Sequence, residues 1–182
     1  MSCTSAAVYN SIAHCPGDII APGVRATVWF IPQADIASWP TADPKKGNYG
    51  ESGAFTLAEG KKWFTIKGMK SQGNATAEPV GEKPAKSFNV TLNVFVPGLK
   101  DDVIAWANQA SNDDLVFAYQ QADGTIRIVG HEYGECDVAP SMATGSGSGD
   151  QIGETCAITC NMPYQPLSVS GLAALGAIDE GK

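Results

Sequence analysis

Short segments with alternating apolar and polar residues mark most of this chain as β-structure. Seven of them are rich in β-branched or aromatic residues and are bounded by Gly, Pro, Asn or Asp. They are residues 24–32, 54–58, 62–67, 88–96, 115–121, 125–132 and 155–162. Turn residues at short intervals predict a mainly β fold, an antiparallel β-sandwich or partly closed barrel of about six or seven strands.

Two tight turns are expected between these segments. Glu59-Gly60 predicts a hairpin between residues 54–58 and 62–67. The sequence Ala-Asp-Gly at positions 122–124 predicts a second hairpin, which joins the strands on either side of it.

One amphipathic α-helix is predicted over residues 99–110, flanking the sheets. Its apolar stripe, at positions i, i+4, i+7 and i+11, consists of Leu99, Val103, Trp106 and Ala110. We expect Trp106, with Val103 and Leu99, to anchor the helix on a sheet, because a large aromatic side chain buries the most apolar surface.

Residues 69–86 (MKSQGNATAEPVGEKPAK) are polar and contain nothing that is expected to pack a core. Compact domains usually avoid a loop of this length, so we expect an arm that becomes ordered against a neighbouring subunit. Its charged residues are Lys70, Glu78, Glu82, Lys83 and Lys86. Residues 134–140 are expected to be irregular, and the Gly/Ser-rich residues 143–153 flexible.

Length and composition indicate a single domain over residues 1–182. It would have an N-terminal extension of about residues 1–22 and a C-terminal tail of about residues 164–182. No apolar run reaches the ~18 residues of a membrane span, and the first residues lack the pattern of a secretory signal. We therefore expect a cytoplasmic protein whose five cysteines are reduced.

Charge is divided unevenly along the chain. Residues 1–100 carry ten Lys or Arg against seven Asp or Glu, and residues 101–182 carry two against twelve. The acidic excess can serve solubility, or the molecule can have two poles, which suits head-to-tail association. A nucleic-acid-binding protein is a poor fit, because the basic segment is short and poor in arginine.

The residue types used in catalysis and metal binding are present but are not suitably arranged. Cys156 and Cys160 would lie ~13 Å apart on a strand, too far to share one metal ion. Neither histidine, His14 or His131, belongs to a Cys–His catalytic signature. The acids that are adjacent in sequence do not face each other on a helix. We therefore expect no enzyme activity, cofactor or metal site.

A family resemblance is carried by two long segments. Residues 87–134 (SFNVTLNVFVPGLKDDVIAWANQASNDDLVFAYQQADGTIRIVGHEYG) run from a strand into a short helix and end in a strand pair with the phrase I-V-G. Residues 142–163 (MATGSGSGDQIGETCAITCNMP) contain small residues, then Gly-Asp, then a strand. These segments resemble the tail tube proteins of long-tailed bacteriophages and their relatives in contractile injection systems. The phrase VRATVWFIPQADIASWP also resembles such proteins from phages of gut Bacteroidetes.

The resemblance implies a β-sandwich-like subunit, six copies per ring, and rings stacked into a hollow tail tube through which DNA passes without specific binding. The partners would be further copies of the chain and other tail proteins, such as a tape measure, a terminator or a sheath. The implied location is the virion tail, assembled in the cytoplasm of a bacterial host, with no membrane contact.

Family members use an arm from the first half of the chain to touch the next ring, and residues 69–86 or 41–52 match it here. The family's tube lumen is often acidic, which suits the acidic second half of this chain. The candidate lumen acids are Asp113, Asp114, Asp123 and Glu132. No catalytic residue is implied.

Two other kinds of protein fit the same sequence. A capsid decoration, head-fibre or head–tail connector protein would also self-assemble, with a different symmetry. A β-sandwich module that binds carbohydrate or protein would need a flat platform of exposed aromatic side chains. The candidates for that platform are Trp29, Trp39, Trp63 and Tyr49.

Overall fold

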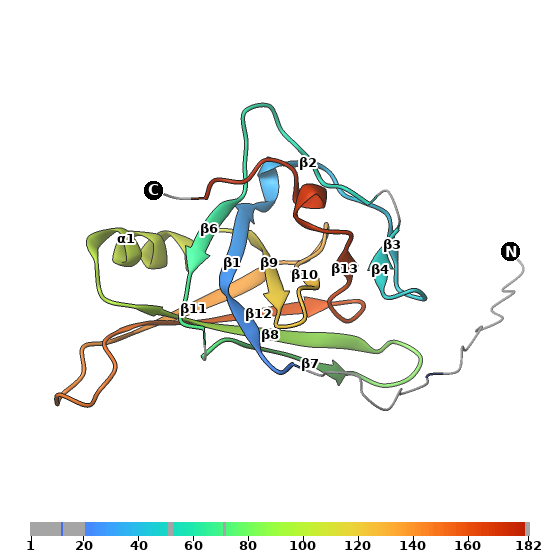
Figure 1. Cartoon of the computed structure of the whole chain (residues 1–182). Helices are drawn as coiled ribbons and strands as arrows, with labels where there is room; N and C mark the ends of the chain where they lie inside the picture. The colour runs from blue at the N-terminus through green and yellow to red at the C-terminus, as the bar shows by residue number, and fades with distance from the viewer. Residues whose placement is uncertain (1–11, 13–20, 51–52, 71, 181–182) are drawn as a thin grey trace, which may run out of the picture.

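The structure, a computed structural model, describes residues 12, 21–50, 53–70 and 72–180. These residues are mainly β with one α-helix, as the sequence predicts, and they form a sandwich in which no described sheet closes into a barrel (Figure 1). The expected N-terminal extension lies largely outside the described residues.

The upper layer in Figure 1 is a seven-stranded sheet. In spatial order its strands are β3 (Ala42–Asp43), β4 (Asn48–Tyr49), β13 (Ser168–Val169), β10 (Ile126–Val129), β9 (Leu115–Gln121), β1 (Val24–Pro32) and β6 (Phe64–Lys67). Neighbouring strands are antiparallel except β4 and β13, which are parallel. The predicted hairpin at positions 122–124 is present and joins β9 to β10.

The lower layer is an antiparallel four-stranded sheet. In spatial order its strands are β11 (Cys136–Ala143), β12 (Gly153–Met162), β8 (Ser87–Pro97) and β7 (Asn74–Val80). The remaining elements are the strand pair β2 (Ile36–Ser38) and β5 (Thr56–Leu57), the 3-10 helices η1 (Gln33–Asp35) and η2 (Leu172–Leu175), and helix α1 (Asp101–Ala110).

Strands β1 and β9 separate two hydrophobic cores. Val28 of β1 and Phe117 of β9 face the four-stranded sheet and pack in the first core against residues such as Leu92. The alternate residues, Trp29 of β1 and Val116 of β9, pack in the second core on the opposite face. The apolar run of β9 therefore reflects burial on both faces rather than the alternation of a half-buried strand.

The C-terminal segment covers the second core and is not a free tail. β13 extends the seven-stranded sheet, and Ala174 and Leu175 of η2 are buried. Ile178 forms a parallel bridge with Trp63, next to β6. The residues of the expected C-terminal tail therefore close one side of the domain.

Helix α1 connects the two sheets, and Trp106 packs against the first core. The indole ring of Trp106 meets the ring of Phe30 edge-on, with centroids 5.6 Å apart. Val103 is half-buried on the same side of the helix. The helix begins at Asp101 rather than at residue 99, so Leu99 lies in the preceding turn and not on the helical stripe.

The prediction that residues 69–86 contain nothing to pack a core is wrong. They contain edge strand β7, whose Ala75 and Ala77 pack against the first core while Asn74 and Thr76 are exposed. The alternation was missed because alanine is a weak hydrophobic signal and is depleted in strands.

Two further predictions require correction. Residues 134–140 are not irregular throughout, because β11 starts at Cys136 and alternates Cys136 and Val138 inward. The turn at Glu59-Gly60 exists, but it does not join a hairpin. β5 pairs with β2 and β6 pairs with β1, since each finds its partner in a different sheet.

Gly153 allows β12 to start in close contact with β8. A Cβ atom there would overlap the Val96 carbonyl oxygen and lie 2.6 Å from the Phe95 ring. We predict that Gly153→Ala lowers the free energy of unfolding in urea by roughly 1–3 kcal/mol, because a packed site cannot absorb a methyl group. The control is Gly149→Ala, where nothing lies within 4 Å. Equal midpoints for the two variants would contradict this packing.

Candidate functional site

The outer face of the four-stranded sheet carries the side chains that point away from the first core. Along β8, Val90 and Leu92 point into the first core, whereas Asn89 and Thr91 point outward. The same alternation runs through the other three strands, so the face is built from the polar half of each strand.

Side chains on this outer face are aligned in rows across the strands. One row is Thr76, Thr91, Thr159 and Asp137, the next is Asn74, Asn93, Ala157 and Ala139, and the third is Glu78, Asn89 and Asn161. Asn93 donates a hydrogen bond from Nδ2 to Oδ1 of Asn74 at 2.9 Å. The middle rows of this face are therefore polar and made of small side chains, whereas Phe95 and Val80 place apolar side chains toward its two ends.

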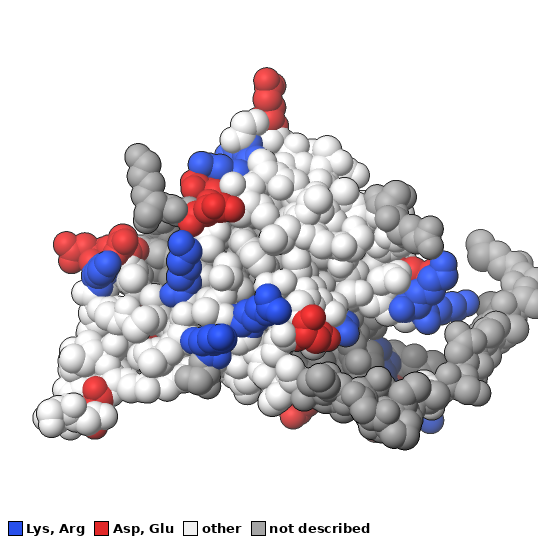
Figure 2. All heavy atoms as spheres, in the orientation of Figure 1, with Lys and Arg blue, Asp and Glu red and all other residues white. Residues whose placement is uncertain are grey.

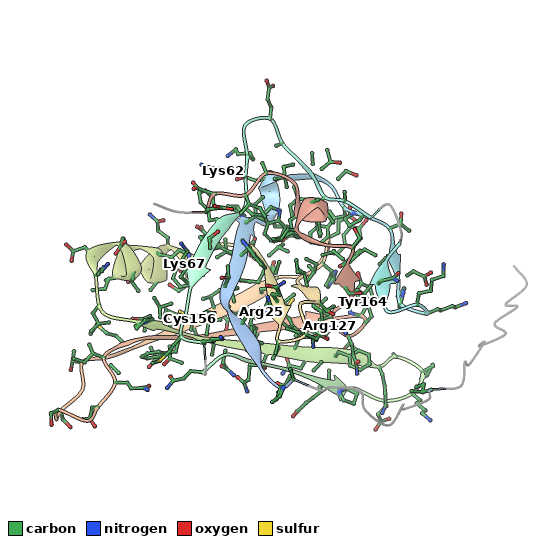
Figure 3. All side chains as sticks on the ribbon, in the orientation of Figure 1. Arg25, Lys62, Lys67, Arg127, Cys156 and Tyr164 are labelled. Carbon is green, nitrogen blue, oxygen red and sulfur yellow. The ribbon has the colours of Figure 1, made fainter. Side chains whose placement is uncertain are left out.

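The charges of the four-stranded sheet have one sign. None of its strands contains Lys or Arg, and the outward charges along these rows are Glu78 on β7 and Asp137 on β11. Figure 2 shows basic side chains over the face that carries β1 and β6, where Figure 3 places Arg25 and Lys67. The two poles seen in the sequence do not correspond to the two sheets, because each sheet contains strands from both halves of the chain.

Arg127, the exception in the acidic half of the chain, is held within the seven-stranded sheet (Figure 3). Its Nε donates to Oε1 of Gln121 at 2.9 Å, and its Nη1 donates to the Pro166 carbonyl oxygen at 2.7 Å. Arg127 therefore links β10 to the C-terminal segment and does not reach the outer face of the other sheet.

The direction of the backbone groups in β8 follows from two hydrogen bonds. Phe95 accepts from Met69 N–H at 2.7 Å on the β7 side, and Gly98 donates to the Ile152 carbonyl at 2.9 Å on the β12 side. Because backbone groups alternate sides along a strand, odd-numbered residues of β8 bond toward β7 and even-numbered residues toward β12.

Both edges of this sheet consequently present a few outward backbone groups. On β7, the backbone N–H and C=O groups of Ala75 and Ala77 point away from β8, toward the open edge of the sheet. The carbonyl group of Pro79 points the same way, and Pro79 has no N–H. On β11, the backbone groups of Val138 and the carbonyl group of Pro140 point away from β12, toward the other open edge. A proline whose backbone faces the open edge costs no hydrogen bond inside the sheet, because no neighbouring strand is there to accept from its position. It also shortens the stretch of edge with which another strand could pair.

Two hairpin loops extend from opposite ends of the four-stranded sheet. The β7–β8 loop, residues 81–86, lies at the Ser87 end of β8, and the β11–β12 loop, residues 144–152, lies at the Pro97 end. The second loop is organised around Asp150, which accepts hydrogen bonds from Ser146 N–H and Gly147 N–H at 2.7 and 2.9 Å. These bonds lower the pKa of the Asp150 carboxyl.

The charged residues predicted for an arm are distributed over three places, and all are exposed. Lys70 precedes β7, and Glu78 belongs to the outer face of the sheet. Glu82, Lys83 and Lys86 lie in the β7–β8 loop.

The predicted lumen acids do not form one surface. Asp113 and Asp114 precede β9, and Gln33 bonds to the Glu132 carbonyl oxygen beside them at 2.7 Å. Asp123 lies in the β9–β10 turn at the other end of β9, roughly 20 Å away by strand length. Its pKa is lowered because its carboxylate accepts the Thr125 N–H.

The aromatic platform considered for a binding module is not formed. Trp29, Trp63 and Tyr49 are buried in the second core, and Trp39 packs edge-on against Phe55. The described residues contain no cluster of His, Cys, Asp and Glu able to hold a metal ion. Within the same residues, no helix has the length and apolar character needed to cross a membrane.

A groove of about 530 Å³ runs between β6 and α1. Its floor includes Phe30, Phe64 and Trp106, and the rings of Phe30 and Phe64 stack at 5.4 Å. Lys67 and Asp102 are among the charged residues at its rim. Lys100 and Glu180 also line it.

Glu154 is a charged side chain buried within the described part of the chain. It lies at the start of β12 with 3% of its surface exposed, and burial raises the pKa of its carboxyl. A raised pKa in an open cleft would indicate a functional acid, but Glu154 does not line the groove between β6 and α1. We interpret it as a carboxylate whose burial costs stability.

We predict that Glu154→Gln stabilises the protein at pH 8. A carboxyl whose folded-state pKa is raised holds its proton more tightly when folded, so its contribution to stability declines as pH rises. The substitution should raise the thermal midpoint at pH 8 by on the order of 2–4 °C for each 1 kcal/mol gained. The gain should shrink toward pH 4, and a loss of stability at pH 8 would indicate a favourable partner for the carboxylate.

Comparisons with known proteins identify no relative of this chain. No family model, no curated protein and no solved structure matches it. The resemblance to tail tube proteins therefore remains a prediction from the sequence. Function is inferred from the geometry and chemistry of the four-stranded sheet.

Proposed function

We propose that this chain is a virion structural protein, the tail tube subunit of a long-tailed bacteriophage, and that the outer face of its four-stranded sheet lines the channel. The observation that carries the proposal is a sheet face with polar middle rows and no Lys or Arg, bounded by two edges with outward backbone groups. The fold class agrees with the one that the sequence resemblance implies.

The chemistry of the outer face suits contact with DNA without retention. Affinity for DNA comes mainly from Lys and Arg at phosphates, and the strands of this sheet have neither. Its Thr and Asn side chains bind water, and Glu78 and Asp137 repel phosphate. This assignment replaces the scattered acids that the sequence suggested for the lumen.

The edges of the sheet suit a head-to-tail joint between copies. β7 of one subunit would pair with β11 of the next, which is a heterologous contact that closes into a ring when the rotation permits. Pairing would satisfy the outward groups of Ala75, Ala77 and Val138 and cover edges that otherwise promote aggregation. A ring of six copies is the number implied by the resemblance.

The two hairpin loops suit contacts between stacked rings. They lie at opposite ends of the same sheet, so each loop would face a different neighbouring ring. The β7–β8 loop carries Lys83 and Lys86 against Glu82, and the β11–β12 loop carries Asp150. Their opposite net charges favour a head-to-tail stack.

The first test is electron microscopy of the purified protein, with Ala77→Pro as the interface variant. We expect rings and tubes from the unaltered chain and only folded monomers from Ala77→Pro. The substitution removes an outward N–H that bonds to nothing within the described sheet, so circular dichroism should be unchanged.

The control is Ala77→Ser, which keeps the N–H and should still assemble. Monodisperse monomers of the unaltered chain under all salt conditions would count against the proposal. Rings that persist in Ala77→Pro would exclude the β7 edge as the joint. Threefold or fivefold particles would instead assign the chain to the capsid decoration or connector proteins.

The second test adds positive charge to the outer face. We predict that Thr159→Lys combined with Thr91→Lys makes the assembled protein retain DNA at 50 mM salt and release it at about 200 mM, because the added cations contact phosphates. Gel-shift and sedimentation measurements with double-stranded DNA would detect this, and the unaltered chain should not bind. The control adds two lysines far from the face, at Ala34 and Ala173, and should behave as the unaltered chain.

A further inference from the structure

Three described cysteines lie on the inner face of the four-stranded sheet, and two of them form a pair. Cys136 of β11 is directly opposite Cys160 of β12, and both side chains belong to the first core. Cys156 lies on the same face of β12 but is opposite Pro140 and has no thiol across from it. The three thiols are free.

The register makes the Cys136–Cys160 pair suitable for a disulfide bond. Odd-numbered residues of β12 bond toward β11, so Cys160 turns its backbone groups toward β8 and Cys136 turns its own outward. Opposite residues of this non-hydrogen-bonded kind have Cα atoms about 4.5 Å apart, with side chains closer than in a hydrogen-bonded pair. That separation lies within the range found in disulfides.

The two thiols also interact with each other. Their interaction raises the pKa of Cys136 and lowers that of Cys160. Cys156 has no such partner, and burial raises its pKa to about 12. Because the thiolate is the reactive form, Cys160 is the best placed of the three to start thiol exchange.

We propose that Cys136 and Cys160 form a reversible cross-strand disulfide that fastens edge strand β11 to β12 under oxidising conditions. The oxidant is a small-molecule disulfide such as oxidised glutathione. The Cys160 thiolate attacks one of its sulfurs and releases one glutathione; the Cys136 thiolate then attacks the Cys160 sulfur and releases the second. Two protein thiols are oxidised, one glutathione disulfide is reduced, and the two protons end on the released thiols.

The position of β11 provides the route for the reagent. Cys136 and Cys160 are 4% and 0% exposed, so the closed sheet excludes glutathione. β11 is an edge strand held by β12 alone within its sheet, and such strands open locally more readily than central strands. Oxidation should therefore be slow in buffer and faster in low urea. This chemistry depends on the register of the sheet and not on the proposed assembly.

The experiment incubates the reduced full-length chain with oxidised glutathione, with and without low urea, and then alkylates the remaining thiols. Peptide mass spectrometry should find the Cys136 peptide linked to the Cys160 peptide, with Cys156 alkylated. The oxidised protein should unfold on the order of 5–10 °C higher than the reduced protein, because the bond closes a loop of the unfolded chain.

Matched variants separate this bond from other thiol chemistry. The increase in unfolding temperature on oxidation should persist in Cys156→Ala and disappear in Cys160→Ala. Cys156 is labelled in Figure 3. Full alkylation of Cys136 and Cys160 after oxidation in urea would overturn the proposal, as would a bond that links either of them to Cys156. An oxidised protein no more stable than the reduced one would refute the fastening of β11.

Discussion

The burial of β1 and β9 on both faces governs how the other elements are arranged. Trp29 and Val116 pack on one side of these strands, and Val28 and Phe117 pack on the other. Each fully buried side chain of this size contributes roughly 1.5–3 kcal/mol. Strands buried in this way must pair their backbone groups within the sheet, which places each of them between two neighbouring strands. The four-stranded sheet covers one face of these two strands, and the C-terminal segment covers the other.

This arrangement determines where the molecule can meet a partner. Both faces of the seven-stranded sheet carry hydrophobic cores, whereas the four-stranded sheet uses only its inner face. Its outer face is therefore free to be polar, and the absence of Lys and Arg from its strands gives it one sign of charge. Pro79 and Pro140 face the open edges of the sheet with their backbones, and they limit the length over which another strand can pair there.

Much of the fold could be predicted from the sequence because several elements carry their own signal. The β-branched and aromatic run of β1, the alternation in β8, the helix around Trp106 and the turn between β9 and β10 each depend on residues close together in the chain. Edge strands β7 and β11 could not be recognised in this way. Their inward residues include Ala75, Ala77 and Cys136, whose weak hydrophobic signal becomes informative only beside a partner strand.

The fold class, the helix and the uneven charge along the chain follow from composition and local periodicity, so they could be read from the sequence. Which residues share a surface is set by the tertiary structure. It separated Asp123 from Asp113, aligned Thr76 with Thr91 and Thr159, and set Cys136 opposite Cys160. Such groupings depend on strand register between distant segments, and register is set by the packing of a whole sheet against its core.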